Sequence, residues 1–66
     1  MKNYHYRAHV TLEDGTTDSC TSPDMSDIIY TLGRWLDIHR VVRWKILKIF
    51  ENEIGSFELL FDSEEV

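Results

Sequence analysis

Apolar and polar residues alternate along the first part of the chain, from residue 4 to residue 12. The apolar positions of this alternation are Tyr4, Tyr6, Ala8, Val10 and Leu12. The positions between them are His5, Arg7, His9 and Thr11. A period of two is typical of a strand that buries one face and exposes the other. We therefore predict a strand here, with the even-numbered side chains facing the core.

A tight turn follows this strand. Glu13-Asp14-Gly15 contains a glycine that can adopt the left-handed conformation of a hairpin turn, and a segment rich in threonine and serine follows. The sequence allows two registers for the resulting hairpin. If Leu12 lies opposite Thr16, then Cys20 faces the core. If the turn has only two residues, Ser19 faces the core instead.

A helix is predicted after the hairpin. Ser22-Pro23-Asp24 provides a capping side chain, a proline that the first helical turn tolerates, and a carboxylate at the positive end of the helix dipole. Apolar residues then recur with the spacing of a helix that has one apolar face. They are Met25, Ile28, Ile29, Leu32 and Leu36. Gly33 lies at the edge of this stripe, where we expect it to allow close approach to the sheet.

The segment from residue 41 to residue 50 fits two secondary structures. Its apolar residues match the period of a helix, whereas its many β-branched residues favour a strand. We favour the strand, because a single helix from residue 24 to residue 50 is unusually long for so small a domain. A turn over residues 51–55 and an alternating segment over residues 56–61 then predict one more strand.

These elements predict an α+β fold with the order ββαββ, in which an antiparallel sheet of about four strands carries one helix on one face. Residues 1–61 form the single domain, and residues 62–66 form an acidic tail. The sheet face away from the helix presents Leu47, Ile49 and Leu60. Apolar side chains gathered on an exposed face mark contact surfaces, so we predict a homodimer or a partner surface through this sheet face.

Length and charge narrow the range of functions. The chain has 66 residues, which make one domain whose core is too small to enclose a large pocket. Its formal net charge of −5 opposes general attraction to a phosphate backbone, so direct nucleic-acid binding is not expected. Acidic residues lie on both sides of a central basic segment. That segment holds Arg34, Arg40, Arg43, Lys45 and Lys48.

The cysteine content and the hydropathy of the chain indicate its compartment. Cys20 is the only cysteine and cannot form an internal disulfide, which is typical of a reducing cytoplasm. No segment approaches the roughly 20 apolar residues of a membrane span, and the first residues lack the apolar core of a signal peptide. We expect a cytoplasmic protein with no membrane contact.

Residues suited to catalysis or metal binding are sparse. His5 and His9 share one strand face but lie roughly 13 Å apart at about 3.3 Å per residue, which is too far for one zinc ion. Cys20 in a strand is more typical of a small buried residue than of a nucleophile. Glu13 and Asp14 lie in a turn open to water, where we expect near-normal acidity. The sequence therefore predicts no enzyme, no cofactor and no metal site.

Two kinds of binding protein fit the remaining features. A small nucleic-acid-binding module could use the basic segment Arg40–Lys48, with bases stacked on Trp35 and Trp44, although aromatic residues at this spacing more often belong to the core. A small inhibitor could instead place carboxylates where an enzyme expects phosphates, with association accelerated by complementary fields. The acidic balance of the chain favours the inhibitor.

Three short motifs carry a resemblance to a known family. Leu12-Glu13-Asp14-Gly15, Met25-Ser26-Asp27 and Leu32-Gly33 resemble the very small phage-encoded inhibitors of uracil-DNA glycosylase from phages of Bacillus. The resemblance covers about residues 8–50. It implies a non-enzymatic, DNA-mimicking dimer in the cytoplasm of an infected bacterial host. Such a protein blocks the DNA cleft of a host DNA-processing enzyme and receives one of its apolar side chains in a hydrophobic pocket.

The resemblance also assigns site residues. The residues matched to partner contact are the acids Glu13, Asp14, Asp24 and Asp27, with Tyr30 and Trp35 as walls of the pocket. Two features depart from the family pattern. Ser22-Pro23-Asp24 replaces an apolar start of the helix, and the basic run from residue 40 to residue 48 interrupts the negative surface.

Overall fold

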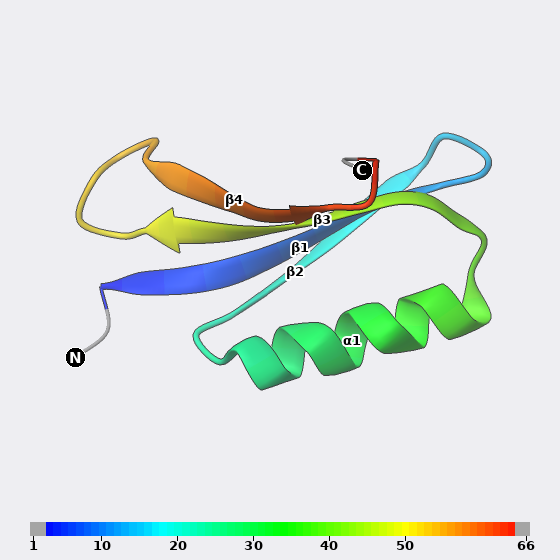
Figure 1. Cartoon of the computed structure of the whole chain (residues 1–66), viewed down its shortest axis with the longest axis horizontal. Helices are drawn as coiled ribbons and strands as arrows, with labels where there is room; N and C mark the ends of the chain where they lie inside the picture. Colours follow the sequence, from blue (N-terminus) through cyan, green and yellow to red (C-terminus); the bar gives the residue numbers. More distant parts are fainter. Residues whose placement is uncertain (1–2, 65–66) are drawn as a thin grey trace.

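The computed structural model describes residues 3–64 as one sheet covered by one helix. The elements are β1 (Tyr4–Leu12), β2 (Thr17–Ser22), α1 (Met25–Ile38), β3 (Val41–Phe50) and β4 (Phe57–Asp62). The four strands form an antiparallel sheet in the order β2-β1-β3-β4. Helix α1 runs along one face of this sheet (Figure 1). The predicted α+β fold with the order ββαββ is confirmed.

The first hairpin takes the register in which Leu12 lies opposite Thr16. The Leu12 N–H donates to the Thr16 carbonyl at 2.8 Å, and Ala8 lies opposite Cys20. Gly15 has a φ of +89°, the left-handed conformation that a glycine adopts without strain. Cys20 therefore faces the helix side of the sheet, which settles the choice between the two registers.

Residues 41–50 form a strand, as predicted. Strand β3 pairs with β1 along its whole length, from Tyr4 opposite Phe50 to Leu12 opposite Val41, and pairs with β4 on its other side. The helix has already ended at His39, whose N–H donates to the Trp35 carbonyl at 2.9 Å. As an inner strand between β1 and β4, β3 can bond its backbone groups on both sides.

The core lies between α1 and the middle of the sheet. Its buried residues are Ala8 and Val10 on β1, Ile28 and Leu32 on α1, and Ile46 on β3. Two members of the predicted apolar stripe lie elsewhere: Ile29 is 59% exposed and Leu36 is 44% exposed. The apolar stripe is therefore buried only in part, because α1 packs over β1 and β2 and leaves β3 and β4 largely uncovered.

Asp24 caps the helix. Its Oδ1 accepts hydrogen bonds from the Ser26 N–H at 3.0 Å and from the Ser26 hydroxyl at 2.8 Å. Pro23 precedes the cap, so the prediction that it lies in the first helical turn is wrong. Ser22 supports this corner, since its hydroxyl accepts from the Asp24 N–H and donates to Asp27. Within residues 3–64, no helix is long and apolar enough to cross a membrane.

Removal of this cap is expected to destabilise the domain. Asp24→Ala deletes the acceptor for the first helical N–H groups, which lowers the free energy of unfolding by about 1 kcal/mol. Asp24→Asn keeps a side-chain oxygen at the same place and should lose much less. Urea unfolding followed by circular dichroism measures both variants. Equal losses would show that the negative charge, and not the acceptor, stabilises the helix start.

A bulge in β4 reverses part of the predicted side-chain pattern. Phe57 pairs with Ile49 and Leu59 with Leu47, but the register shifts before Phe61, which pairs with Ile46. Leu60 consequently packs against the core. The prediction that Leu60 lies on the face away from the helix is wrong. Phe57 and Leu59 lie before the bulge and point outward with Ile49 and Leu47, and the extra residue then turns Phe61 toward the helix side with Ile46.

The end of the described chain is bonded to β3. Asp62 is the last residue of β4, and its Oδ2 accepts from Arg43 Nη2 at 2.8 Å. Ser63 exchanges two hydrogen bonds of 2.9 Å with the Trp44 backbone, and Glu64 lies 3.5 Å from Arg43. Residues 62–64 of the predicted tail are thus attached to the sheet, and residues 65–66 lie outside the described part.

The Arg43 and Asp62 pair predicts a pH dependence of stability. The hydrogen bond from Arg43 is the largest cause that lowers the Asp62 pKa, and the Glu64 N–H adds to it. A carboxyl whose folded pKa lies below its ordinary value of about 4 stabilises the fold above that value, and this contribution is lost as the pH falls through the folded pKa. Asp62→Asn should flatten the unfolding curve in that acid range. An unchanged acid profile would contradict the role given to this pair.

Candidate functional site: an apolar groove beside the helix

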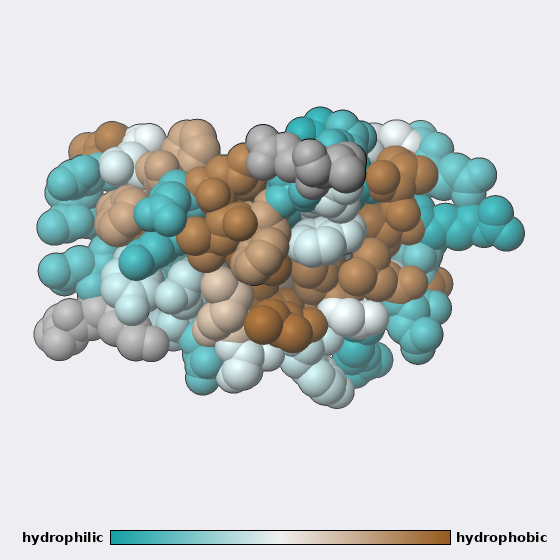
Figure 2. Space-filling model, in the orientation of Figure 1, coloured by the Kyte–Doolittle hydropathy of each residue, from teal (hydrophilic) through white to brown (hydrophobic). Residues whose placement is uncertain are grey.

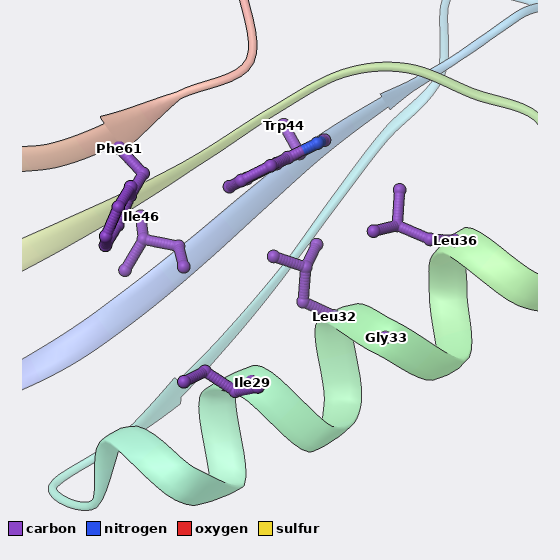
Figure 3. A pocket seen from close by; sticks show the side chains of 7 residues that line it. All are labelled: Ile29, Leu32, Gly33, Leu36, Trp44, Ile46 and Phe61. Carbon is purple, nitrogen blue, oxygen red and sulfur yellow. The ribbon is translucent and has the colours of Figure 1, made fainter.

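An apolar groove lies between α1 and the helix-facing side of β3 and β4. It has a volume of about 300 Å³. Its lining consists of Ile29, Leu32, Gly33, Leu36, Trp44, Ile46 and Phe61. Figure 3 shows the side chains from the helix and from the sheet pointing into the same space. We call this feature the apolar groove.

The groove follows from the number of elements in the fold. Four strands about 4.8 Å apart make a sheet roughly 19 Å wide, whereas one helix with its side chains is about 10 Å wide. Helix α1 therefore covers about half of the sheet. Hydrophobic surface gathers across the middle of this side of the molecule, and hydrophilic residues lie toward both ends (Figure 2). An apolar surface of this kind is typical of a contact site.

Gly33 lies in the helical wall of the groove. A Cβ added to this residue would have no atom within 4 Å, so the expected close approach between Gly33 and the sheet is wrong. Glycine inside a helix costs about 1 kcal/mol relative to alanine. No close contact that a side chain would prevent compensates for this cost. The missing side chain instead keeps the groove open.

The acidic residues assigned by the resemblance lie at opposite ends of the molecule. Glu13 and Asp14 lie in the first hairpin turn, where the Glu13 N–H donates to the Arg40 carbonyl just beyond the end of α1. Asp24 and Asp27 lie at the start of α1. A helix of 14 residues separates the two pairs by about 20 Å. They form two acidic ends and not one continuous patch (Figure 1).

The two aromatic residues assigned to a pocket lie outside the groove. Tyr30 is exposed on α1 and lies beside the Arg34 guanidinium, 6.0 Å from the ring centre. Trp35 is half-buried and packs against the core. The groove takes its aromatic walls from Trp44 and Phe61 instead. Tyr30 and Trp35 do not line this groove, because the open side of α1 is the one that carries Ile29 and Leu36. Their contact with a partner stays a prediction.

Asp14 is more acidic than expected for an exposed turn. The Thr16 hydroxyl donates to Asp14 Oδ1 at 2.7 Å and the Thr16 N–H donates at 2.9 Å. These two bonds, the hydroxyl first, lower the pKa of Asp14 below its ordinary range. The carboxylate is therefore held both charged and in a fixed orientation at the tip of the hairpin. The expectation of near-normal acidity is wrong for this residue.

The central basic segment does not form one surface. Lys48 lies on the helix side of the sheet, with its ammonium 4.1 Å from the centre of the Tyr4 ring. Arg43 and Lys45 lie on the opposite face, where Arg43 pairs with acids of the chain end. Arg40 is exposed in the loop after α1 and lies 3.6 Å from Glu13. These basic residues therefore do not form the contiguous stripe that the nucleic-acid-binding alternative requires.

The titratable groups of the strands show no arrangement for catalysis. Burial, followed by the charges of Arg7 and Lys45, lowers the His9 pKa. His5 Nδ1 lies 2.9 Å from Glu51 and is thus engaged with the loop after β3. Burial raises the Cys20 pKa, which keeps the thiol protonated and weakly nucleophilic at neutral pH. No cluster of three or more metal-ligating side chains occurs among the residues that the structure describes.

Comparison with known proteins adds no relative. The chain matches no known protein family, no curated protein and no solved structure.

Proposed function

We propose that the chain is a non-catalytic protein-binding domain whose apolar groove receives apolar side chains of a partner. The observation that carries this proposal is the open groove around Gly33, a residue that weakens the free helix and at which an added Cβ would meet no atom within 4 Å. A folded domain gains stability from a partner that covers such a surface, since burial of apolar area contributes about 25 cal/mol per Å². Exposed Ile29, Leu36 and Phe61 supply much of that area.

The charge layout supports a more specific proposal, an inhibitor that mimics DNA and blocks a DNA-processing enzyme such as uracil-DNA glycosylase. One acidic pair lies at the start of α1, the other lies in the hairpin turn beyond its end, and the groove lies between the two. An enzyme that binds DNA offers basic groups on either side of its cleft, which the two acidic ends can approach together. The net charge of −5 favours rapid, salt-sensitive association with such an enzyme.

A glycosylase assay tests this proposal. Cleavage of uracil-containing DNA by purified uracil-DNA glycosylase is expected to fall to background as the protein is added up to excess. The inhibition should weaken with added salt, because salt screens the attraction between the acidic ends and the basic groups of the enzyme. Undiminished cleavage in a large excess of folded protein would reject the glycosylase as the partner.

The acidic turn should contribute to the rate of this association. Glu13→Gln combined with Asp14→Asn removes two charges but keeps the oxygen that holds Thr16, so the turn is retained. We expect the association rate to fall about tenfold at low salt. The matched control is Glu53→Gln combined with Glu58→Gln, which changes the net charge equally at exposed positions elsewhere. An equal loss in both double variants would contradict a specific role for the hairpin turn.

A further inference from the structure

The sheet face away from α1 carries a small polar hollow between β1 and β3. It has a volume of about 90 Å³ and is lined by His9, Thr11, Arg43, Trp44 and Lys45. The register explains which side chains meet there, since His9 lies opposite Lys45 and Thr11 lies opposite Arg43. Opposite residues of an antiparallel pair have Cβ atoms about 5 Å apart. These residues therefore form one compact group, which we call the outer hollow.

Positive charge dominates around the outer hollow. Among the residues that the structure describes, no carboxylate lies within 4 Å of the Lys45 ammonium or the Arg7 guanidinium. Arg43 differs, because it donates a hydrogen bond to Asp62 and lies 3.5 Å from Glu64. Asp62 lies opposite Lys45, but its side chain is only 7% exposed and is bonded to Arg43. The charges of Lys45 and Arg7 are thus available to a ligand.

The imidazole of His9 senses this local field. Burial is the largest cause that lowers its pKa, and the charges of Arg7 and Lys45 lower it further. Both charged groups that act on His9 are positive, although the chain as a whole has a net charge of −5. Ser19 on β2, the opposite neighbour of His9 on its other side, carries no charge. Positive groups gathered on one sheet face repel one another, and a bound anion would replace that repulsion with attraction.

We propose that the outer hollow binds one small, doubly charged tetrahedral oxyanion of the phosphate or sulfate type. The Lys45 ammonium, a ring N–H of His9 and the Thr11 hydroxyl can each donate a hydrogen bond to its oxygens. The volume corresponds to about three water molecules at roughly 30 Å³ each, which is room for one such group. The site lies on the face opposite the apolar groove and does not depend on the proposed function.

Binding at this site is expected to depend on pH through His9. Without an anion, the cations around His9 favour the neutral ring, whereas a bound dianion favours the protonated ring. Binding therefore takes up a proton, and the affinity rises as the pH falls through the His9 pKa. The charged groups around His9 keep their charges over this range; they are Arg7 on the same strand, Lys45 and Arg43 on β3, and Asp62 on β4. Sulfate, which stays doubly charged, should bind at least fivefold more tightly at about pH 5 than at about pH 8. Equal affinity at both pH values would overturn the role of His9 in the site.

A nuclear magnetic resonance titration with sodium sulfate at about pH 6 tests the site itself. The ring signals of His9 should shift and saturate, with a dissociation constant on the order of 1 mM. The ring signals of His39, which lies beyond the end of α1, serve as an internal control and should not follow the same curve. Sodium chloride at the same ionic strength is the reference. Shifts of His9 that do not saturate, or that chloride produces equally, would overturn the proposal.

A matched pair of lysine variants distinguishes a site from general attraction of an anion to the chain. Lys45 and Lys48 both lie on β3 and are half-buried, but only Lys45 lines the outer hollow, since Lys48 lies on the helix side. Lys45→Gln should weaken sulfate binding at least fivefold, and Lys48→Gln, with the same change of charge, should bind like the unaltered chain. Circular dichroism verifies that both variants are folded. Equal losses in the two variants would overturn the proposal.

Two further probes distinguish the sources of the anion. Inorganic phosphate and adenosine monophosphate present the same group, once as a free ion and once attached to a larger molecule. Saturable shifts of His9 with both support the site, and the tighter of the two identifies free or esterified phosphate as its ligand. Absence of a saturable shift with both would overturn the assignment to phosphate.

Discussion

Ile28→Ala is expected to lower the free energy of unfolding by about 3 kcal/mol, which is most of the stability of a domain this small. Ile28 has no exposed surface and shares the core with four other buried residues within residues 3–64. With so few core residues, the neighbours of the vacated space have little freedom to close it. Much of the variant population should therefore be unfolded near 37 °C.

Ile29→Ala is the matched control for this prediction. The two isoleucines are adjacent on α1, but Ile29 is 59% exposed and lines the apolar groove. Its truncation should change the unfolding free energy by no more than about 0.5 kcal/mol, since alanine also favours the helix. Urea unfolding measures both variants. Similar losses at the two positions would mean that Ile29 is part of the core in solution.

Gly33→Ala is expected to increase the free energy of unfolding by about 1 kcal/mol, which is unusual for a single substitution. Alanine removes the conformational freedom that glycine has in the unfolded chain, and its Cβ meets no atom within 4 Å. In a domain of roughly 3–5 kcal/mol this is a large gain. Thermal and urea unfolding both report it. A destabilised variant would show that the helix near Gly33 differs from the structure.

A larger side chain at position 33 is expected to preserve or increase stability and to weaken binding. Gly33→Leu keeps a helix-compatible residue but places a large side chain on the wall of the apolar groove. We expect this variant to remain at least as stable as the unaltered chain and to lose inhibition of the glycosylase by tenfold or more, about 1.4 kcal/mol of binding free energy. Full inhibition by Gly33→Leu would show that the partner does not enter the groove.

The regular elements could be predicted from the sequence because each rests on a local pattern. Alternation from Tyr4 to Leu12 defined β1, and an apolar stripe with an acidic cap defined α1. The density of β-branched residues correctly favoured a strand over residues 41–50. These patterns depend on periods of two and 3.6 residues, which are written in the chain itself.

The groove and the bulge depend on how the elements are placed, and local patterns do not record this. A helical stripe shows which residues are apolar, but not that α1 covers β1 and β2 and leaves Ile29 and Leu36 open. The bulge near Leu60 changes which side of the sheet the last side chains of β4 face, and no glycine or proline marks it in the sequence. One signal was available: a four-stranded sheet with a single helix must leave half of one face uncovered.

The fold is confirmed, whereas the site residues assigned by resemblance stay predictions. Glu13 and Asp14 are exposed at one end of the molecule and Asp24 and Asp27 at the other, so the structure separates what the motif treated as one surface. Contact between these acids and a partner stays a prediction. The motif did not indicate the groove between them, because three of its lining residues come from the second half of the chain: Trp44, Ile46 and Phe61.

A binding titration of two isoleucine variants against uracil-DNA glycosylase tests the proposed role of the groove most directly. Ile29 and Ile38 both lie on α1 and are exposed to 59% and 61%, but only Ile29 is among the groove residues. Ile29→Gln should weaken binding at least tenfold, and Ile38→Gln should bind like the unaltered chain. Absence of binding by the unaltered chain, or equal binding by both variants, would contradict the account.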